Sequence, residues 1–269
     1  MAAALGASVA GMTATREHLG THMVLTDSQK NFFVAVAANV RSGGSQALLR
    51  EFKKRYKSEW LHYGLARDLS QPFRNPSAKI PIAVRPLRDE DIPRMLGMEA
   101  TQLSDRGPYV RMHRLNFIEV GIGTCFVGAT ENDEPCYMQW LIPARDNTKI
   151  QKYFRGIFPI LEPDEALLEY AFTPERWQGQ GIMPAAMAQI SEKARDFGAR
   201  RVITFVDSSN VPALRGCRKA GYVPCLARID RWRLFRRQFV FQELAYDQQW
   251  GTTILGARTP RTSPVSAGV

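Results

Sequence analysis

The 269-residue sequence contains no long apolar segment and only four cysteines. No apolar run reaches about 18 residues, so no membrane span is predicted. The stretch 1–12 is apolar but short and has no charged start, which argues against a secretory signal. The cysteines, which form no C-x-x-C pair, are Cys125, Cys136, Cys217 and Cys225. We therefore expect reduced thiols in a cytoplasmic protein rather than disulfides or zinc ligands.

Excess charge is absent from the middle of the chain. Residues 80–230 carry 19 Lys and Arg against 19 Asp and Glu, whereas residues 1–79 carry 11 against 5 and residues 231–269 carry 6 against 2. Nucleic acid is therefore not an expected partner of the centre. The basic ends are compatible with RNA, an acidic partner, a membrane surface, or simply a solvated face and a tail. His18 and His22 lie four residues apart without a third ligand, so no metal site is predicted.

The segment 172–181, of sequence FTPERWQGQG, is the most informative one. It follows an apolar run and precedes residues with helical periodicity, which predicts a strand, a glycine-rich turn and a helix N-terminus. The first amides of a helix have no internal partner and carry a partial positive charge, so such a turn binds anions. The Lys-Ser/Thr of a P-loop is absent after Gly181, and the spacing is not G-x-G-x-x-G. The sequence therefore predicts a pyrophosphate loop of another type.

This loop resembles the R/Q-x-x-G-x-G/A signature of the GNAT acetyltransferase superfamily, with Arg176, Gly179 and Gly181 at its three defined positions. The segment 210–222 resembles the family's second signature, N-x-x-A-x-x-x-Y-x-K-x-G-F. The segment 82–92 is similar to its opening strand and first helix. The resemblance covers about residues 80–240. It implies an α/β fold with a mixed central sheet flanked by helices, and a chain of bacterial type with an N-terminal helical extension.

We predict three parts: an extension at 1–79, an acetyltransferase domain at 80–245 and a disordered tail at 246–269. The extension should contain helices at 28–41 and 46–63, followed by a linker. An apolar stripe along the second helix comprises Leu48, Leu49, Phe52, Tyr56 and Trp60. Packing on the core is the expected role of this stripe, and a homodimer contact or membrane association is also compatible with it.

Within the domain, periodicity and turn signals predict the remaining elements. Strands are expected at 80–87, 124–129, 136–142, 166–172, 201–206, 223–228 and 232–241. Helices are expected at 89–98, 107–120, 182–197 and 210–220.

The resemblance implies acetyl-CoA as cosubstrate, without a metal, and it indicates which residues bind it. These are Phe172, Thr173, Arg176, Trp177, Gln178, Gly179, Gln180, Gly181, Ile182, Met183, Asn210 and Lys219. In the family, the strands beside the loop splay apart, and a backbone amide of the first strand binds the oxyanion. Here the amides near 170–173 are the candidates.

Three side chains are candidates for proton transfer. Glu169 and Glu165 lie on or beside the strand before the loop, where a glutamate is the base in some relatives, often through water. The alternative is a strand-edge charge paired with an arginine. Cys217 stands where the family has tyrosine, and it is either the acid, since a thiol has a reference pKa of about 8.5, or a packing residue. Tyr222 is expected in the core.

Taken together, these features predict an N-acetyltransferase that moves an acetyl group from acetyl-CoA to a primary amine by direct transfer in a ternary complex. Two alternatives stay open. One is a longer acyl donor carried by CoA or acyl carrier protein, with aromatic residues of 153–158 lining its channel. The other is a CoA-binding regulatory module with little turnover. The acceptor is not identified, and the segments 100–123 and 144–163 are expected to bind it.

Overall fold

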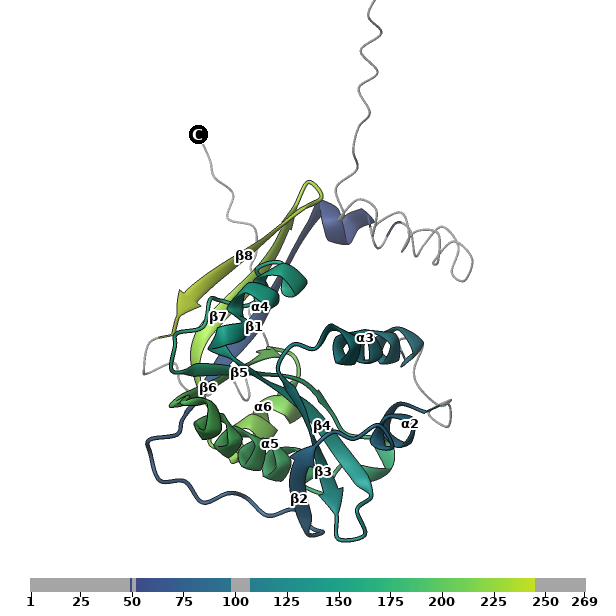
Figure 1. The fold of residues 1–269 in the computed structure, drawn as a ribbon. Coiled ribbons are helices and arrows are strands. Elements are labelled where there is room, and N and C mark those ends of the chain that lie inside the picture. The colour runs from purple at the N-terminus through teal and green to yellow at the C-terminus, as the bar shows by residue number, and fades with distance from the viewer. Residues whose placement is uncertain (1–48, 50–51, 98–106, 245–269) are drawn as a thin grey trace, which may run out of the picture. The chain divides into compact units, whose positions relative to one another are not determined.

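The computed structural model describes residues 49, 52–97 and 107–244 of the chain (Figure 1). The chain divides into two compact units, Met1–Lys53 and Lys54–Val269, and the elements below belong to the second. The helix predicted at 28–41 and the tail predicted at 246–269 lie outside the described residues. No helix among the described residues is both long enough and apolar enough to cross a membrane.

Eight strands form one mixed sheet in the order β2-β3-β4-β5-β6-β1-β7-β8. Their bounds are β1 Lys57–Asp68, β2 Ile82–Pro86, β3 Thr124–Thr130, β4 Pro135–Pro143, β5 Glu165–Phe172, β6 Arg201–Asp207, β7 Val223–Arg233 and β8 Arg236–Glu243. All neighbouring strands pair antiparallel except β5 and β6, which are parallel. Every residue of β4 is buried, because helices cover both faces of the sheet at this strand.

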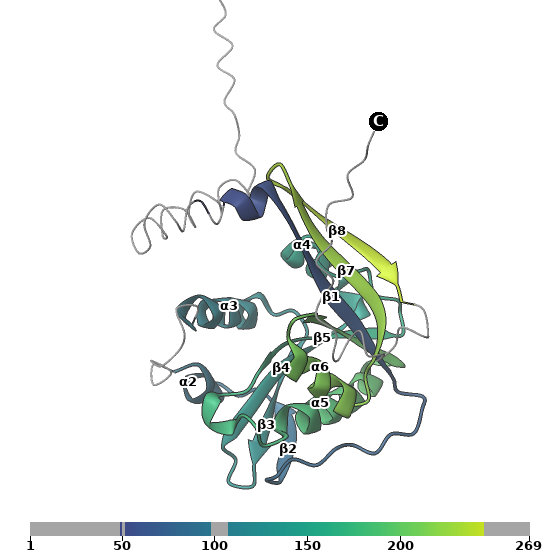
Figure 2. The same ribbon diagram turned by 180° about the vertical axis from the view of Figure 1, so that it is seen from behind.

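Helices lie on the two faces of this sheet (Figures 1 and 2). Their bounds are α2 Asp91–Leu96, α3 Gly107–Val120, α4 Asn147–Phe154, α5 Ile182–Glu192 and α6 Val211–Lys219, with short 3₁₀ turns at Ala144–Asp146, Glu175–Trp177 and Lys193–Phe197. One core cluster contains side chains of α5 and α6, and the other contains side chains of α2, α3 and α4. The predicted mixed sheet flanked by helices is thus confirmed.

The helix predicted at 46–63 is wrong from Lys57 onward. Residues 52–56 are helical, but Lys57 begins β1, which lies between β6 and β7 in the sheet. A spacing of four residues places side chains on one face of a strand as well as of a helix, so the stripe fitted both structures. Tyr56 and Trp60 are 50% and 39% exposed, so their expected packing on the core is also wrong. Pairing of β1 on both edges outweighs the local helical signal.

The strand predicted at 232–241 is also wrong, because a turn divides it. Leu234 and Phe235 have φ angles of 47° and 65° and join β7 to β8 as a hairpin. Positive φ at two successive positions is typical of the tight turns that match strand twist, and such turns usually contain glycine or asparagine. Neither residue is present here, so the local sequence carried no turn signal.

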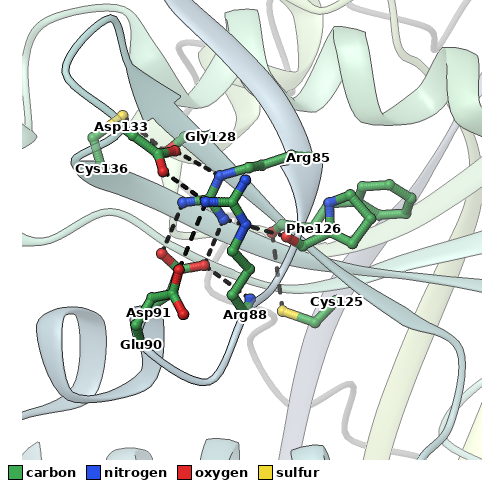
Figure 3. A network of polar contacts seen from close by, with 10 residues as sticks. Arg85, Arg88, Glu90, Asp91, Cys125, Phe126, Gly128, Asp133 and Cys136 are labelled. Carbon is green, nitrogen blue, oxygen red and sulfur yellow. Dashed lines mark hydrogen bonds and ion pairs between the residues drawn. The ribbon is translucent and has the colours of Figure 1, made fainter.

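A charged network fastens α2 and the β3–β4 turn to the edge strand β2 (Figure 3). Asp91 is fully buried and accepts hydrogen bonds from the Arg85 guanidinium and from the Arg88 backbone amide at 2.9 Å. Asp133 accepts a bond from Arg85 at 2.8 Å and one from Arg88 at 2.6 Å. Burial alone would raise the pKa of Asp91, but these donors outweigh it and lower the pKa. The network stabilises the ionised form of a buried carboxylate.

Candidate active site

The strands β5 and β6 separate at the centre of the sheet. Their parallel pairing covers three positions, from Glu165 with Arg201 to Leu167 with Ile203, although β5 continues to Phe172 and β6 to Asp207. Beyond the last of these pairs, β5 carries one extra residue against β4, since Met138 pairs with Phe172 but Trp140 pairs with Glu169. The two strands therefore separate and leave a gap between them, as the resemblance to the GNAT family implied.

Tyr170 lies at this irregularity and has a φ of 59°. A residue inserted into one strand of a pair is a β-bulge, and it takes backbone groups out of the ladder and bends the strand. The backbone between Glu169 and Phe172 is thus released from regular pairing. This is the segment in which the oxyanion-binding amides were predicted.

A cavity of about 830 Å³ occupies the gap. It is bounded by β5 and β6, the loop before α5, residues of α5 and α6, and side chains of β4 and α3. The sequence indicated ten of its lining residues as binders of acetyl-CoA: Phe172, Thr173, Trp177, Gln178, Gly179, Gly181, Ile182, Met183, Asn210 and Lys219. These residues come from two separate signatures, and the fold brings them to one cavity.

The loop before α5 presents free amides to this cavity. Gly179 and Gly181 have φ angles of 73° and 75°, a conformation that glycine adopts at little cost. No side chain caps α5, and its first helical bond is donated by Ala185 to the Gly181 carbonyl at 3.4 Å. The amides of Ile182 and Met183 have no partner within the helix, and Pro184 has no amide hydrogen, so these two amides and the helix dipole favour an anion. The Trp177 indole N–H is also buried without a hydrogen-bond partner among the described residues.

The second helix N-terminus beside the cavity belongs to α6. The Asn210 side chain caps this helix by accepting a hydrogen bond from the Ala213 amide at 3.2 Å. Arg215 and Lys219 lie one helical turn apart on α6, and both line the cavity. Two cations on this face suit the phosphates of a nucleotide cosubstrate. Arg215 was missed in the sequence, although its spacing of four from Lys219 was a usable signal.

Two predicted binders of the cosubstrate do not line the cavity. The Arg176 guanidinium pairs with Glu134 in the β3–β4 turn at 2.8 Å. The Gln180 side chain donates a hydrogen bond to the Arg176 carbonyl at 3.2 Å. Both contacts hold the loop in place, so these side chains act on its shape rather than at the cavity wall.

Glu169 lines the cavity at the point where β5 and β6 part. Its carboxylate accepts a hydrogen bond from the Phe205 backbone amide at 3.0 Å. Burial raises the pKa of Glu169 to about 7, although this hydrogen bond and the nearby Arg228 cation act in the opposite direction. A carboxylate with this pKa exchanges a proton near neutral pH, as a general base must.

Glu165 lies four residues earlier on β5 and is not among the lining residues. Its carboxylate accepts hydrogen bonds from Arg201 on β6 at 2.9 Å and from the Glu162 amide at 3.0 Å. The side chain therefore ties the base of the two strands together, below the point where they separate. The structure gives the two glutamates different surroundings.

Cys217 lines the cavity from α6, but the side chain is only 1% exposed. Its Sγ atom lies 3.9 Å from the Met187 Sδ atom. Burial raises the pKa of the Cys217 thiol to about 12. Tyr222 is buried as predicted, with its hydroxyl 2.7 Å from the Ser191 hydroxyl. These surroundings match a packing role for Cys217 better than an acidic one.

The aromatic residues expected to border a pocket pack elsewhere. Tyr153 and Phe154 contact Phe117 of α3 with ring centroids 5.2 and 5.5 Å apart, and Phe158 contacts Phe154 at 4.8 Å. None of these four side chains lines the cavity. The aromatic side chains of 153–158 therefore belong to the core between α3 and α4.

Further lining residues carry no sequence motif. They are Arg114 on α3, Tyr137 and Gln139 on β4, and Thr204, Phe205 and Asp207 on β6. Their position beside the gap depends on how the strands separate, which no local pattern of the sequence indicates. Among the described residues, no group of three or more His, Cys, Asp or Glu side chains is arranged to hold a metal.

Comparison with known proteins bears on this arrangement. The family described as acetyltransferase (GNAT) domain matches residues 82–223, which is more than half of the chain. The chain belongs to the GNAT acetyltransferase family. The match thus assigns this GNAT protein to an acyltransferase family. The matched residues include all of β5 and β6 and the loop before α5.

Solved structures similar to this GNAT protein include two from bacteria. A GCN5-related N-acetyltransferase from Sphaerobacter thermophilus is 15% identical, with a TM-score of 0.39 over 75% of this chain and 57% of its own. A GNAT-family acetyltransferase from Colwellia psychrerythraea is 13% identical, with a TM-score of 0.43 over 76% and 63%. The chain thus spans about three fifths of the length of each. A search of curated proteins found no match.

Proposed function

We propose that this protein is an acetyl-CoA-dependent N-acetyltransferase that acts on a primary amine by direct transfer in a ternary complex, with Glu169 as general base. The cavity joins an anion-binding loop, expected to bind the pyrophosphate of CoA, to a carboxylate whose pKa is close to neutral. A cytoplasmic location is proposed with it, from the reduced thiols expected of the sequence.

The observation that carries the proposal is the position of Glu169. The side chain lies where β5 leaves β6, and its raised pKa lets the carboxylate remove a proton from an ammonium at neutral pH. Only the neutral amine attacks a carbonyl carbon, so this deprotonation must come first. Glu169 acts directly or through one water.

The backbone near Tyr170 supplies the second function. Amides released by the bulge can donate to the oxygen of the thioester as negative charge develops on it. Acetyl-CoA supplies the acetyl carbonyl: a C–N bond forms to the amine, the C–S bond breaks, and CoA leaves as the thiolate. The proton held by Glu169 returns to solvent, and the second proton, which the nitrogen loses as the tetrahedral intermediate collapses, passes to the CoA thiolate or to solvent. We assign no acid to Cys217, because a thiol with a pKa of about 12 is a poor donor to a CoA thiolate.

Release of free thiol from acetyl-CoA in the presence of a panel of amines tests this function. The expected result is amine-dependent thiol release with a matching gain of one acetyl group in the product mass. A protein that binds CoA but releases no thiol with any amine would be a binding module, which contradicts the proposal. Faster turnover with longer acyl-CoA or with an acyl carrier protein would contradict the choice of acetyl donor.

A further inference from the structure

Arg114 is an arginine of the cavity wall that has no carboxylate partner among the described residues. It projects from α3, and its guanidinium lies 4.4 Å from the centroid of the Phe172 ring at the end of β5. Its Nε atom is buried and has no hydrogen-bond partner among the described residues. No ion pair of Arg114 occurs within the described part of the chain. A guanidinium has five N–H donors, so most of this capacity is free to face the cavity.

Other enclosed arginines of the protein show what Arg114 lacks. Arg67 pairs with Glu192, Arg85 pairs with Asp91 and Asp133, and Arg228 pairs with Asp230 at 2.8 Å. Taking a cation out of water is costly unless a counter-charge compensates for it. In these three cases the protein supplies that charge itself.

The electrostatic state of Arg114 follows from this difference. Burial lowers the pKa of its guanidinium to about 10, so the group remains protonated at neutral pH. The contact with Phe172 is a cation–π interaction, which offsets part of the desolvation and fixes the orientation of the group. The charge is therefore retained and positioned, and no carboxylate of the described residues pairs with it.

Arg114 and Glu169 lie on the same side of the sheet. Phe117, three residues after Arg114 on α3, contacts Trp140 and Tyr170 with ring centroids 5.3 and 4.8 Å apart. Trp140 is the strand partner of Glu169. The cation-bearing helix thus packs over the strand that carries the proposed base.

We propose that Arg114 binds a carboxylate of the acceptor, so that the substrate is an amino acid whose amine is presented to Glu169. The inference rests on the proposed acetyl transfer and adds a substrate class to it. A planar guanidinium matches a carboxylate through two parallel hydrogen bonds, a geometry that lysine cannot reproduce. The phosphates of the cosubstrate have their own binding groups at the N-termini of α5 and α6.

Direct binding tests this inference without requiring turnover. Amino acids with α-, β- and γ-amino groups and their carboxamides, which share shape but lack the negative charge, are titrated by calorimetry into the full chain saturated with CoA. The wild type should bind the acid of at least one pair about ten- to a hundredfold more tightly than its amide, the range for a hydrogen bond to a charged group. Arg114→Gln should abolish this preference, and Arg114→Lys should retain part of it.

Arg111 offers a matched control on the same helix. It lies three residues before Arg114, and its Nε atom is likewise buried without a partner in the described structure, but it does not line the cavity. Arg111→Gln should leave the preference for the acid intact. With the amino acid that binds most tightly as acceptor, Arg114→Gln should raise the KM for thiol release and change kcat little.

The outcomes separate this inference from the proposed function. If the acid and amide of every pair bind equally, or if neither binds, carboxylate recognition by Arg114 is wrong even when other amines are acetylated. If Arg114→Gln weakens CoA itself, the residue serves the cosubstrate instead. If acids bind through Arg114 but no thiol is released from acetyl-CoA, the inference about recognition stands and the proposed activity fails.

Discussion

Replacing Glu169 by glutamine removes the carboxylate that we propose as the base, and with it the only group of this side chain that ionises. Glutamine keeps the acceptor oxygen for the hydrogen bond from the Phe205 amide, so the strand geometry is preserved. The acid limb of kcat/KM, expected near pH 7, should disappear, and the rate should fall by about 10²- to 10⁴-fold. In the wild type, the ionised fraction falls about tenfold for each pH unit below this value.

The same variant has a predictable effect on stability. Because the folded protein holds the proton up to about pH 7 and the unfolded chain loses it near 4.5, the wild type loses stability as pH rises between these values. At about 1.4 kcal/mol per pH unit, this difference amounts to about 3 kcal/mol. Glu169→Gln should therefore gain up to about 3 kcal/mol relative to the wild type between pH 4.5 and 7, and no more above pH 7.

Urea unfolding across this pH range, combined with initial rates of thiol release, measures both effects. Glu165→Gln is the matched control, since Glu165 is on the same strand but pairs with Arg201 and does not line the cavity. It should keep the acid limb while losing stability. A Glu169→Gln variant whose relative stability does not change with pH, or whose acid limb persists, would refute the burial of this carboxylate or its role as base.

Three further predictions concern the loop, the thiol and the central strand. Gly181→Glu should abolish CoA binding in calorimetric titration. Gly198→Glu is the control, because Gly198 has a similar φ but does not line the cavity, and this variant should still bind CoA. Equal CoA affinity of the two variants would contradict the loop assignment. Cys217→Ser should keep kcat within a few-fold, and a loss of about 10²-fold with unchanged CoA binding would instead identify an acid. Deletion of residues 1–75 should prevent folding, because it removes β1 from between β6 and β7. Deletion of residues 1–53 should leave a cooperative thermal unfolding transition in circular dichroism. A folded protein that lacks residues 1–75 would contradict this prediction.

Local chemistry explains why much of the domain is predictable. Gly179 and Gly181 adopt a backbone conformation that favours glycine, and Asn210 caps α6 with its own side chain. The strands and helices around them follow from apolar periodicity, which depends only on neighbouring residues. These signals predict the start of α5 at residue 182 and both limits of α6 to within one residue, whereas α5 ends at Glu192, five residues before its predicted end.

Elements whose conformation depends on distant partners were not predictable in this way. The segment 57–63 becomes a strand because β6 and β7 provide hydrogen bonds on both of its edges, and a four-residue spacing does not distinguish the two structures. The hairpin turn at Leu234 and Phe235 likewise lacks the residues that usually mark one.

The sequence by itself determined the family and the position of the glycine-rich loop before α5, because each depends on short segments of chain. The tertiary structure alone decided which carboxylate faces the cavity. Glu165 lies where β5 still pairs with β6, whereas Glu169 lies beyond the last pair and lines the cavity. It also decided that Cys217 is enclosed and that Arg114 lies at the cavity, where no carboxylate of the described residues pairs with it. Burial and pKa arise from groups far apart in the chain, and no local pattern encodes them.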